Sequence, residues 1–405
     1  MSIVVGRRGR AILSAAALAA CLALGVAAAS RSIWYESTDF YCLWAGARLV
    51  GHGADPYDAS VWRAATGGPH PDPRGGTSET SCASQFSYPL WTAIALLPFG
   101  ALPLPAASSA WAGVSFLGVL VGAVASWRAA GGGRRGSPLF AALVLTAQPL
   151  WLLVISGQLT GVLLGLAGLS ARRLARADDG RAGAIYGLLA LKPQLIALSG
   201  PVLFGWGIAR RPRFALASGA VVAGMAVVTV ALAPGWPGEW LAEVAGRRLG
   251  VAALLPTAWG LSADLFGTVL AAPVLIVLVV ALSIALARGR TTPVGLAAIA
   301  LAISVFAAPH AWSYDHLVLV LPWALTLAIA ERSSGPRRIA LLLATAGVAS
   351  LLPWVLYAIA FARGGETLNA VVPALTALLV AAAVGTEPAA GGLAVDGRSA
   401  PPRRE

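Results

Sequence analysis

Charged residues are scarce in this sequence: they make up 11% of its 405 residues, whereas hydrophobic residues make up 58%. An ordinary globular chain carries about 25% charged residues. So few charges cannot cover a water-facing surface, and the mean hydropathy of +0.77 agrees with this. The composition excludes a soluble globular protein and a disordered chain, and it predicts a protein whose surface mostly faces lipid.

Cysteine, histidine and lysine are also rare. Three cysteines are too few for a disulfide scaffold. Among the four histidines, His310 and His316 lie close together, but no cysteine and no His-Glu-x-x-His pattern accompanies them. We therefore predict no metal and no cofactor. Lysine occurs once, at position 192, so the net charge of +12 comes from arginine.

The arginines lie in clusters between apolar segments, and this distribution predicts the topology. The clusters are at 7–10, 128–135, 172–181, 210–213, 288–290, 332–338 and 398–404. Because cytoplasmic loops of membrane proteins accumulate Lys and Arg, we place all the clusters and both termini in the cytoplasm, and the protein in the plasma membrane. The basic excess is then a topogenic signal, which leaves nucleic-acid binding without support.

Stretches of about 17–25 apolar residues can cross a bilayer as helices. The candidates are 11–29, 107–127, 138–155, 158–174, 213–233, 266–287, 293–309, 316–330, 338–357 and 369–385. Two further segments are predicted as broken or re-entrant, because 89–105 carries Pro98, Pro103 and Pro105 and 182–209 is interrupted by Lys192-Pro193. We predict an all-α polytopic membrane protein with about ten spanning helices, one transmembrane domain over 1–386 and a disordered cytoplasmic tail over 387–405.

The longest polar segment, residues 30–88, is the predicted first extracytoplasmic loop. Residues 37–48 within it have the pattern of an amphipathic helix at the membrane surface. Its apolar face consists of Phe40, Leu43, Trp44 and Ala47. A cap at Ser37 or Thr38 places Asp39 in the first turn, where the helix dipole keeps a carboxylate ionised. A simple capping or dipole role for Asp39 is the alternative to a catalytic one.

The rest of this loop offers weaker candidates. Asp58 can orient a sugar hydroxyl and Tyr57 can provide a stacking face, although the Asp-Pro-Tyr-Asp sequence also suits a plain turn. Cys42 and Cys82 can form a disulfide in an oxidising compartment or remain free thiols.

Lys192 is the strongest single signal in the apolar part of the chain. Ten apolar-biased residues precede it, which places its ammonium about 15 Å deep, near the middle of the hydrocarbon layer. A cation at that depth costs at least roughly 2.5–3.5 kcal/mol. Because Pro193 breaks the helix there, we expect Lys192 to line a cavity and meet an anion. A lysine that extends to the membrane interface is the alternative.

Two connections on the predicted outer side can reach the cavity that Lys192 is expected to line. One is the tight connection 156–161, which exposes Gln158 at its lip. The other is 309–316, whose polar residues are His310, Tyr314, Asp315 and His316. Hydrogen bonding to sugar or phosphate is one interpretation of the second connection, and ordinary interfacial residues are the other.

Taken in order, these motifs resemble the membrane glycosyltransferases of family 87, in the GT-C superfamily. The likeness covers about residues 10–330, and the segment after 330 adds only generic spans. The matching motifs are Asp39-Phe40 with Trp44-Ala45-Gly46-Ala47, Pro56-Tyr57-Asp58, Phe86-Ser87-Tyr88-Pro89-Leu90, Gly157-Gln158, Lys192-Pro193-Gln194-Leu195 and Ser313-Tyr314-Asp315. The family often has Tyr-Pro-Pro where this chain has Tyr-Pro-Leu.

The resemblance implies a GT-C-like fold and a hexosyltransferase that uses a polyprenyl-phosphate sugar, with mannose as the sugar in the better-known members. The acceptor would be a lipid-linked molecule or a glycolipid outside the cytoplasm. Asp39 matches the position of the family's base. A lipid phosphate departs without protonation, so one carboxylate suffices for a single inverting displacement.

In this hypothesis Lys192, with Arg48 or His310, neutralises the departing phosphate. The expected substrate-binding residues are Tyr57, Asp58, Tyr88, Gln158, Gln194, Tyr314, Asp315 and His316. The main alternative is a secondary transporter of an anionic or lipid-linked substrate, and a non-catalytic scaffold is a third possibility. Transporters usually contain two interrupted helices in pseudo-symmetric halves, whereas only one segment here contains Lys-Pro, which favours the enzyme.

Overall fold

The structure is a computed structural model, and it describes residues 38–67, 70–71, 77–78, 82, 86–289 and 291–387. The predicted first span at 11–29 lies outside the described residues, as does the predicted tail beyond residue 387.

Nearly all of the described chain is helical, so the predicted all-α class is confirmed apart from one short strand pair. The helices are α2 (Asp39–Gly51), α3 (Ala59–Thr66), α4 (Leu90–Ala95), α5 (Leu97–Gly100), α6 (Leu104–Ala129), α7 (Ser137–Thr146), α8 (Gln148–Ser156), α9 (Thr160–Leu174), α10 (Asp179–Gly187), α11 (Ser199–Arg210), α12 (Pro212–Leu232), α13 (Trp236–Val251), α14 (Ala258–Phe266), α15 (Ala272–Ala287), α16 (Pro293–Ala307), α17 (Val320–Arg332), α18 (Gly335–Ala346), α19 (Leu352–Arg363) and α20 (Val371–Gly385). Tighter helical segments are η2 (Leu188–Leu191), η3 (Pro193–Ile196), η4 (Ala252–Leu254), η5 (Val269–Ala271), η6 (Ser313–Leu319), the π-helical η7 (Gly347–Leu351) and η8 (Thr367–Ala370). Strands β1 (His70–Pro71) and β2 (Thr77–Ser78) pair antiparallel, with His70 opposite Ser78.

Six helical segments of the described chain are long and apolar enough to cross a membrane, and the pair α7 and α8, bent by 51°, makes a seventh. They coincide with the predicted spans 107–127, 138–155, 213–233, 266–287, 316–330, 338–357 and 369–385. The predicted spans 158–174 and 293–309 form α9 and α16, each only 15 residues long. A helix of that length rises roughly 22 Å, less than the hydrocarbon thickness. The count of about ten spans is therefore not confirmed.

The core of the bundle is built around the close pairing of α6 with α9 and around one central helical segment. Helices α6 and α9 cross closely because glycines on each let the backbones approach, as small residues do in membrane bundles. These glycines are Gly118, Gly122, Gly161, Gly165 and Gly168. The continuous segment η6–α17 lies at the centre, packed against α6, α16, α18 and α20, and it is buried from residue 315 to residue 330.

The predicted break at Lys192-Pro193 is confirmed. The chain leaves η2, passes through an extended Lys192, and re-enters a helical turn at Pro193. Irregular backbone at this depth needs other partners for its carbonyls. Helix α4 supplies them: Trp91 Nε1 donates to the Ala190 carbonyl at 2.8 Å, and Thr92 Oγ1 donates to that of Leu191 at 2.7 Å. The proline-broken segment 89–105 thus supports the break in the second segment.

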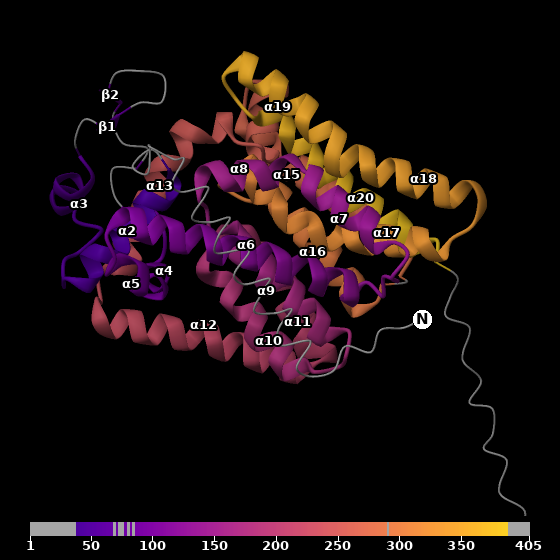
Figure 1. Cartoon of the computed structure of the whole chain (residues 1–405), viewed down its shortest axis with the longest axis horizontal. Helices are drawn as coiled ribbons and strands as arrows, with labels where there is room; N and C mark the ends of the chain where they lie inside the picture. The colour runs from indigo at the N-terminus through magenta and orange to yellow at the C-terminus, as the bar shows by residue number, and fades with distance from the viewer. Residues whose placement is uncertain are drawn as a thin grey trace, which may run out of the picture.

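The arginine clusters of the described residues gather at one end of the bundle, and the predicted clusters at 7–10 and 398–404 lie outside the described residues. Arg332 donates to the carbonyl of Ala130 at 3.1 Å, and Arg211 pairs with Asp179 at 3.3 Å. Helix α6 has 26 residues, a rise of about 39 Å, and it runs from the neighbourhood of α2 and α5 to this arginine-rich end. Figure 1 shows α2, α4 and α5 at one end of the molecule and the connection between α17 and α18 at the other.

Candidate functional site

Helix α2 carries Asp39 into the protein. It begins at Asp39, with Thr38 at the N-cap position, as predicted. The helix was expected on the membrane surface, but it is packed against α4 and α5, and even Ala45 and Gly46 on its other side are buried. Phe40 stacks on Trp111 of α6 with ring centroids 5.4 Å apart, which anchors the helix next to Asp39.

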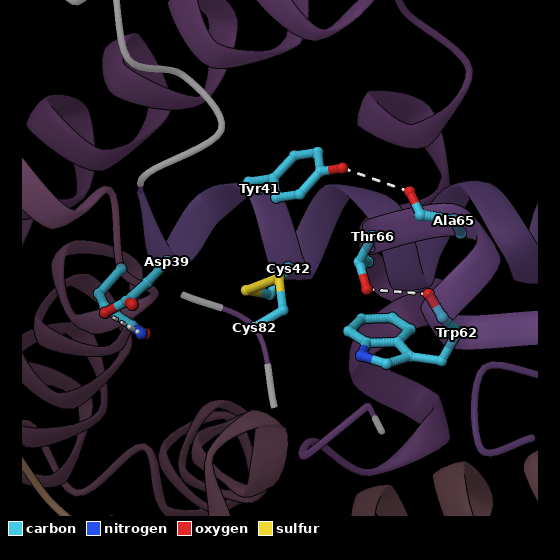
Figure 2. Close-up of a disulfide and its surroundings, with 8 residues drawn as sticks. Asp39, Tyr41, Cys42, Trp62, Ala65, Thr66 and Cys82 are labelled. Carbon is cyan, nitrogen blue, oxygen red and sulfur yellow. Dashed lines mark hydrogen bonds between the residues drawn. A yellow bond between two sulfur atoms is a disulfide. The ribbon is translucent and has the colours of Figure 1, made fainter. Parts of the chain in front are cut away.

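Cys42 and Cys82 form a disulfide, which resolves the two alternatives left by the sequence. Figure 2 shows this bond on α2, the helix that also carries Asp39. It ties Cys82 to the helix that carries the carboxylate.

The connection between α8 and α9 holds the Asp39 carboxylate. Gly157 has φ +66°, and a Cβ there would lie 2.9 Å from the Cβ of Phe40, so only glycine allows this approach. The next residue, Gln158, donates through Nε2 to Asp39 Oδ2 at 2.8 Å. Tyr88 donates to Gln158 Oε1 at 2.9 Å. Because the amide oxygen is engaged by Tyr88, the amide nitrogen is oriented toward the carboxylate.

Lys192 forms a buried ion pair with Asp315. Its Nζ lies 2.6 Å from Asp315 Oδ1, and the two side chains are 2% and 0% exposed. Thr160 of α9 donates to the same oxygen at 2.7 Å, and the Trp312 backbone N–H donates to Asp315 Oδ2 at 3.1 Å. The carboxylate is thus fully hydrogen-bonded, which a buried ion pair requires.

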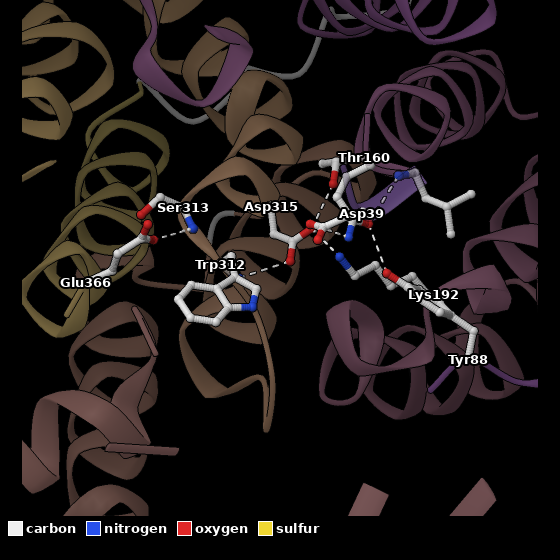
Figure 3. Close-up of polar contacts among 10 residues, drawn as sticks. Asp39, Tyr88, Thr160, Lys192, Trp312, Ser313, Asp315 and Glu366 are labelled. Carbon is white, nitrogen blue, oxygen red and sulfur yellow. Dashed lines mark hydrogen bonds and ion pairs between the residues drawn. The ribbon is translucent and has the colours of Figure 1, made fainter. Parts of the chain in front are cut away.

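Tyr314 joins the ion pair to Asp39. Its hydroxyl hydrogen-bonds to the Asp39 carboxylate, and the Lys192 ammonium lies 5.0 Å from the centre of its ring. In Figure 3 Asp39, Lys192 and Asp315 meet from three elements distant in sequence. The expected convergence of the acidic group and the single lysine is therefore present.

The electrostatics of Asp39 differ from the helix-dipole expectation. Asp39 is partly buried, and this burial raises the pKa of its carboxyl above the usual range. Hydrogen bonds from Gln158 and Tyr314 and the charge of Lys192 oppose the increase but do not cancel it. A carboxylate with a raised pKa is a stronger base than an exposed aspartate.

A cavity of about 320 Å³ opens beside this cluster. Its walls are mostly apolar, and its polar side chains come from the predicted motifs. It is lined by Ser87, Tyr88, Pro193, Gln194, Ala197, Trp240, Leu241, Val244, Ala252, Leu255, Pro309 and His310. Tyr88 belongs both to the cavity wall and to the hydrogen-bonded chain that reaches Asp39, so the cavity and the carboxylate are adjacent.

Sequence reasoning missed the contribution of the chain after residue 330, which was expected to add only generic spans. Glu366 accepts the Ser313 backbone N–H at 3.0 Å, and Asn369 Nδ2 donates to Ser313 Oγ at 2.7 Å. Both residues therefore hold the start of η6, directly before Tyr314 and Asp315. Thr160 was also missed. Glu366 and Asn369 stand at the start of the apolar segment 369–385, and polar residues at that position were the signal in the sequence that could have indicated this contribution.

Four predicted residues lie elsewhere. Arg48 is exposed at the far end of α2, where it stacks on Trp44 and contacts the Gly100 carbonyl. Asp58 is exposed and caps α3 through Ser60 and Val61, as a turn residue would.

Tyr57 is 2% exposed and donates to the Tyr88 carbonyl at 2.6 Å, so its ring supports Tyr88 and offers no free stacking face. His316 is 1% exposed and hydrogen-bonds to the Pro256 carbonyl. Each of these four side chains contacts backbone atoms outside the Asp39–Lys192 cluster, and their assignment to substrate or phosphate binding stays a prediction.

Comparison with known proteins identifies the family. The family model described as Glycosyltransferase family 87 matches residues 86–322, which is more than half of the chain. This range contains Tyr88, Gln158, Lys192 and Asp315, whereas Asp39 precedes it. Searches of the curated proteins and of the solved structures gave no match. The chain therefore belongs to glycosyltransferase family 87 and is a glycosyltransferase with several membrane-spanning helices.

Proposed function

We propose that this protein transfers a hexose, with mannose as the proposed sugar, from a polyprenyl-phosphate sugar to a lipid-linked or glycolipid acceptor. The GT-C-like mechanism is a single displacement with inversion. The observation that carries the proposal is the cluster of Asp39, Tyr314 and Lys192 beside a mostly apolar cavity. A carboxylate and an ammonium close to each other, beside a mostly apolar cavity, are the groups that transfer from a lipid-borne donor requires.

In the proposed step, an acceptor hydroxyl oxygen attacks the anomeric carbon. The bond from that carbon to the phosphate oxygen breaks, and Asp39 takes the hydroxyl proton. Gln158 and Tyr314 hold the Asp39 carboxylate in position by hydrogen bonds, and neither residue carries a positive charge that would neutralise it. The raised pKa of the carboxyl group favours proton acceptance. The polyprenyl phosphate leaves as an anion, so no second carboxyl group is needed as an acid.

Lys192 is suited to stabilise that leaving anion. An ammonium has three N–H donors, and the contact with Asp315 engages one of them, which leaves donors for a phosphate oxygen. Asp315 would act as the positioning residue that holds the ammonium in place. In a cavity that excludes water this attraction strengthens as charge develops on the phosphate.

The cavity wall also fits the proposed substrates. Trp240, Leu241, Val244 and Leu255 present apolar surface of the kind that covers a prenyl chain. Gln194 and His310 offer the polar contacts that a sugar or phosphate needs.

We place the reaction on the extracytoplasmic side of the plasma membrane. The arginine-rich end of the bundle lies opposite α2, and positively charged ends face the cytoplasm. The Cys42–Cys82 disulfide suits an oxidising compartment.

The test is transfer from a radiolabelled polyprenyl-phosphate mannose to glycolipid by the purified full-length protein in detergent. We expect Asp39→Asn to lower the rate by about 10²–10⁴-fold, the usual contribution of a general base. Asp58→Asn is the matched control, because that exposed carboxylate caps helix α3. An Asp39→Asn protein with wild-type transfer would refute the assignment of the base. Failure of the wild-type protein with every polyprenyl-phosphate hexose would refute the donor class.

A further inference from the structure

A second cavity, of about 350 Å³, lies at the arginine-rich end of the bundle. It is bounded by the α6–α7 connection, the end of α17 and the start of α18. Asp315 and Glu331 lie at opposite ends of η6–α17, 16 residues and therefore about 24 Å apart. This cavity is separate from the site of the proposed reaction.

One wall of the cavity is a glycine-rich loop held by Glu331. Its Oε2 accepts the Gly133 N–H at 2.8 Å, and its Oε1 accepts the Gly136 N–H at 3.0 Å. Trp127 braces the same loop by donating from Nε1 to the Gly133 carbonyl at 3.1 Å. Both carboxylate oxygens of Glu331 are thus engaged in building the cavity.

Two arginines line this cavity from different elements: Arg135 in the connection before α7 and Arg338 in the first turn of α18. Neither guanidinium makes an ion pair or a hydrogen bond within the part of the chain that the structure describes. The nearby Arg332, in contrast, pairs with Glu387 at 2.8 Å. The two arginines and Glu331 together give the cavity lining a formal charge of +1. The guanidinium donors of both arginines remain available to a ligand.

The remaining walls are apolar. Leu327 and Leu342 line the cavity with Trp127, and Leu139 at its edge is 49% exposed, as a lipid-facing residue would be. A guanidinium binds phosphate oxygens in a bidentate manner, and basic pockets between membrane helices bind anionic lipid headgroups.

From this combination we infer that the cavity binds the headgroup phosphate of an anionic phospholipid from the leaflet at this end of the bundle. Arg135 and Arg338 hold the phosphate, and the leucines contact the first part of the acyl chains. The inference does not depend on the sugar donor or on the transfer reaction.

The test is lipid binding to the purified full-length protein, followed by native mass spectrometry in detergent. The probes are phosphatidylglycerol, phosphatidylcholine and inorganic phosphate. We expect one phosphatidylglycerol to bind in preference to phosphatidylcholine. Each arginine contributes about fivefold, so the Arg135→Gln/Arg338→Gln double variant should bind about 25-fold more weakly. Arg134→Gln, an exposed arginine of the same loop that does not line the cavity, should bind as the wild type does.

Equal binding by the double variant and the wild type would overturn the inference. Equal affinity for phosphatidylglycerol and phosphatidylcholine would do so as well, as would displacement of phosphatidylglycerol by millimolar inorganic phosphate. Both arginines are at the surface, so the thermal stability of the double variant without added lipid should match that of the wild type and show that it folds.

Discussion

The ion pair between Lys192 and Asp315 allows a quantitative test of how the site is held together. Replacing Asp315 with Asn keeps the shape of the side chain but leaves the buried ammonium without a counter-charge. At an Nζ–Oδ1 distance of 2.6 Å the attraction is roughly 6 kcal/mol for an effective dielectric constant of about 20. Part of this is offset by desolvation, so we expect Asp315→Asn to lower the free energy of unfolding by about 3–5 kcal/mol.

The double variant Lys192→Met/Asp315→Asn isolates the interaction energy between the two charges from the contacts that each side chain makes with other residues. Because it removes both charges, it should cost less than the sum of the two single variants, by about 1–3 kcal/mol. The matched control is Asp264→Asn, since Asp264 pairs with Arg363 at 2.9 Å but the arginine is 51% exposed. That exposed pair should contribute less than about 1 kcal/mol.

Unfolding in mixed detergent and SDS micelles, followed by tryptophan fluorescence, measures all four variants. Equal destabilisation by Asp315→Asn and Asp264→Asn would refute the reasoning, as would strict additivity of the two single variants. Donor binding adds a second readout: Lys192→Met should lose affinity for the polyprenyl-phosphate sugar, and unchanged affinity would contradict its assigned function.

Three further outcomes are expected. Because burial raises the pKa of Asp39 and the base must be ionised, transfer should fall with decreasing pH through a pKa above the ordinary 3.8, and a rate–pH profile that stays flat down to pH 4 would contradict this. Gly157→Ala places a Cβ at a left-handed position, so it should cost about 1–3 kcal/mol of stability and slow transfer, whereas Gly180→Ala, which meets open space, should do neither. Replacing Cys42 and Cys82 with serine opens a 40-residue loop, so thermal melting should show a loss of about 4 kcal/mol, and an unchanged melting temperature would exclude a stabilising disulfide.

Much of the site could be predicted because some of its signals are local. Asp39 follows a capping residue at the start of a helix, and Lys192 precedes a proline in an apolar segment, so both stand out without tertiary information. The assignments of Arg48, Tyr57 and Asp58 to substrate binding stay predictions. The sequence did not show that these side chains contact backbone atoms, and for Arg48 and Tyr57 those atoms are 52 and 31 positions away.

The sequence by itself determined the class of the protein. Its shortage of charge requires a lipid-facing surface, the spacing of its apolar residues requires helices, and Pro193 requires a break beside the single lysine. These properties depend on neighbouring residues along the chain.

Only the tertiary structure decided which side chains meet. Lys192 and Asp315 are 123 positions apart, and Asp39 and Gln158 are 119 apart. These contacts form because glycine-lined helices approach closely and because the chain after residue 330 holds the start of η6. No local pattern specifies how helices pack, since that depends on the fit of whole surfaces. The arrangement of Asp39, Lys192 and the cavity therefore became visible only in the folded protein.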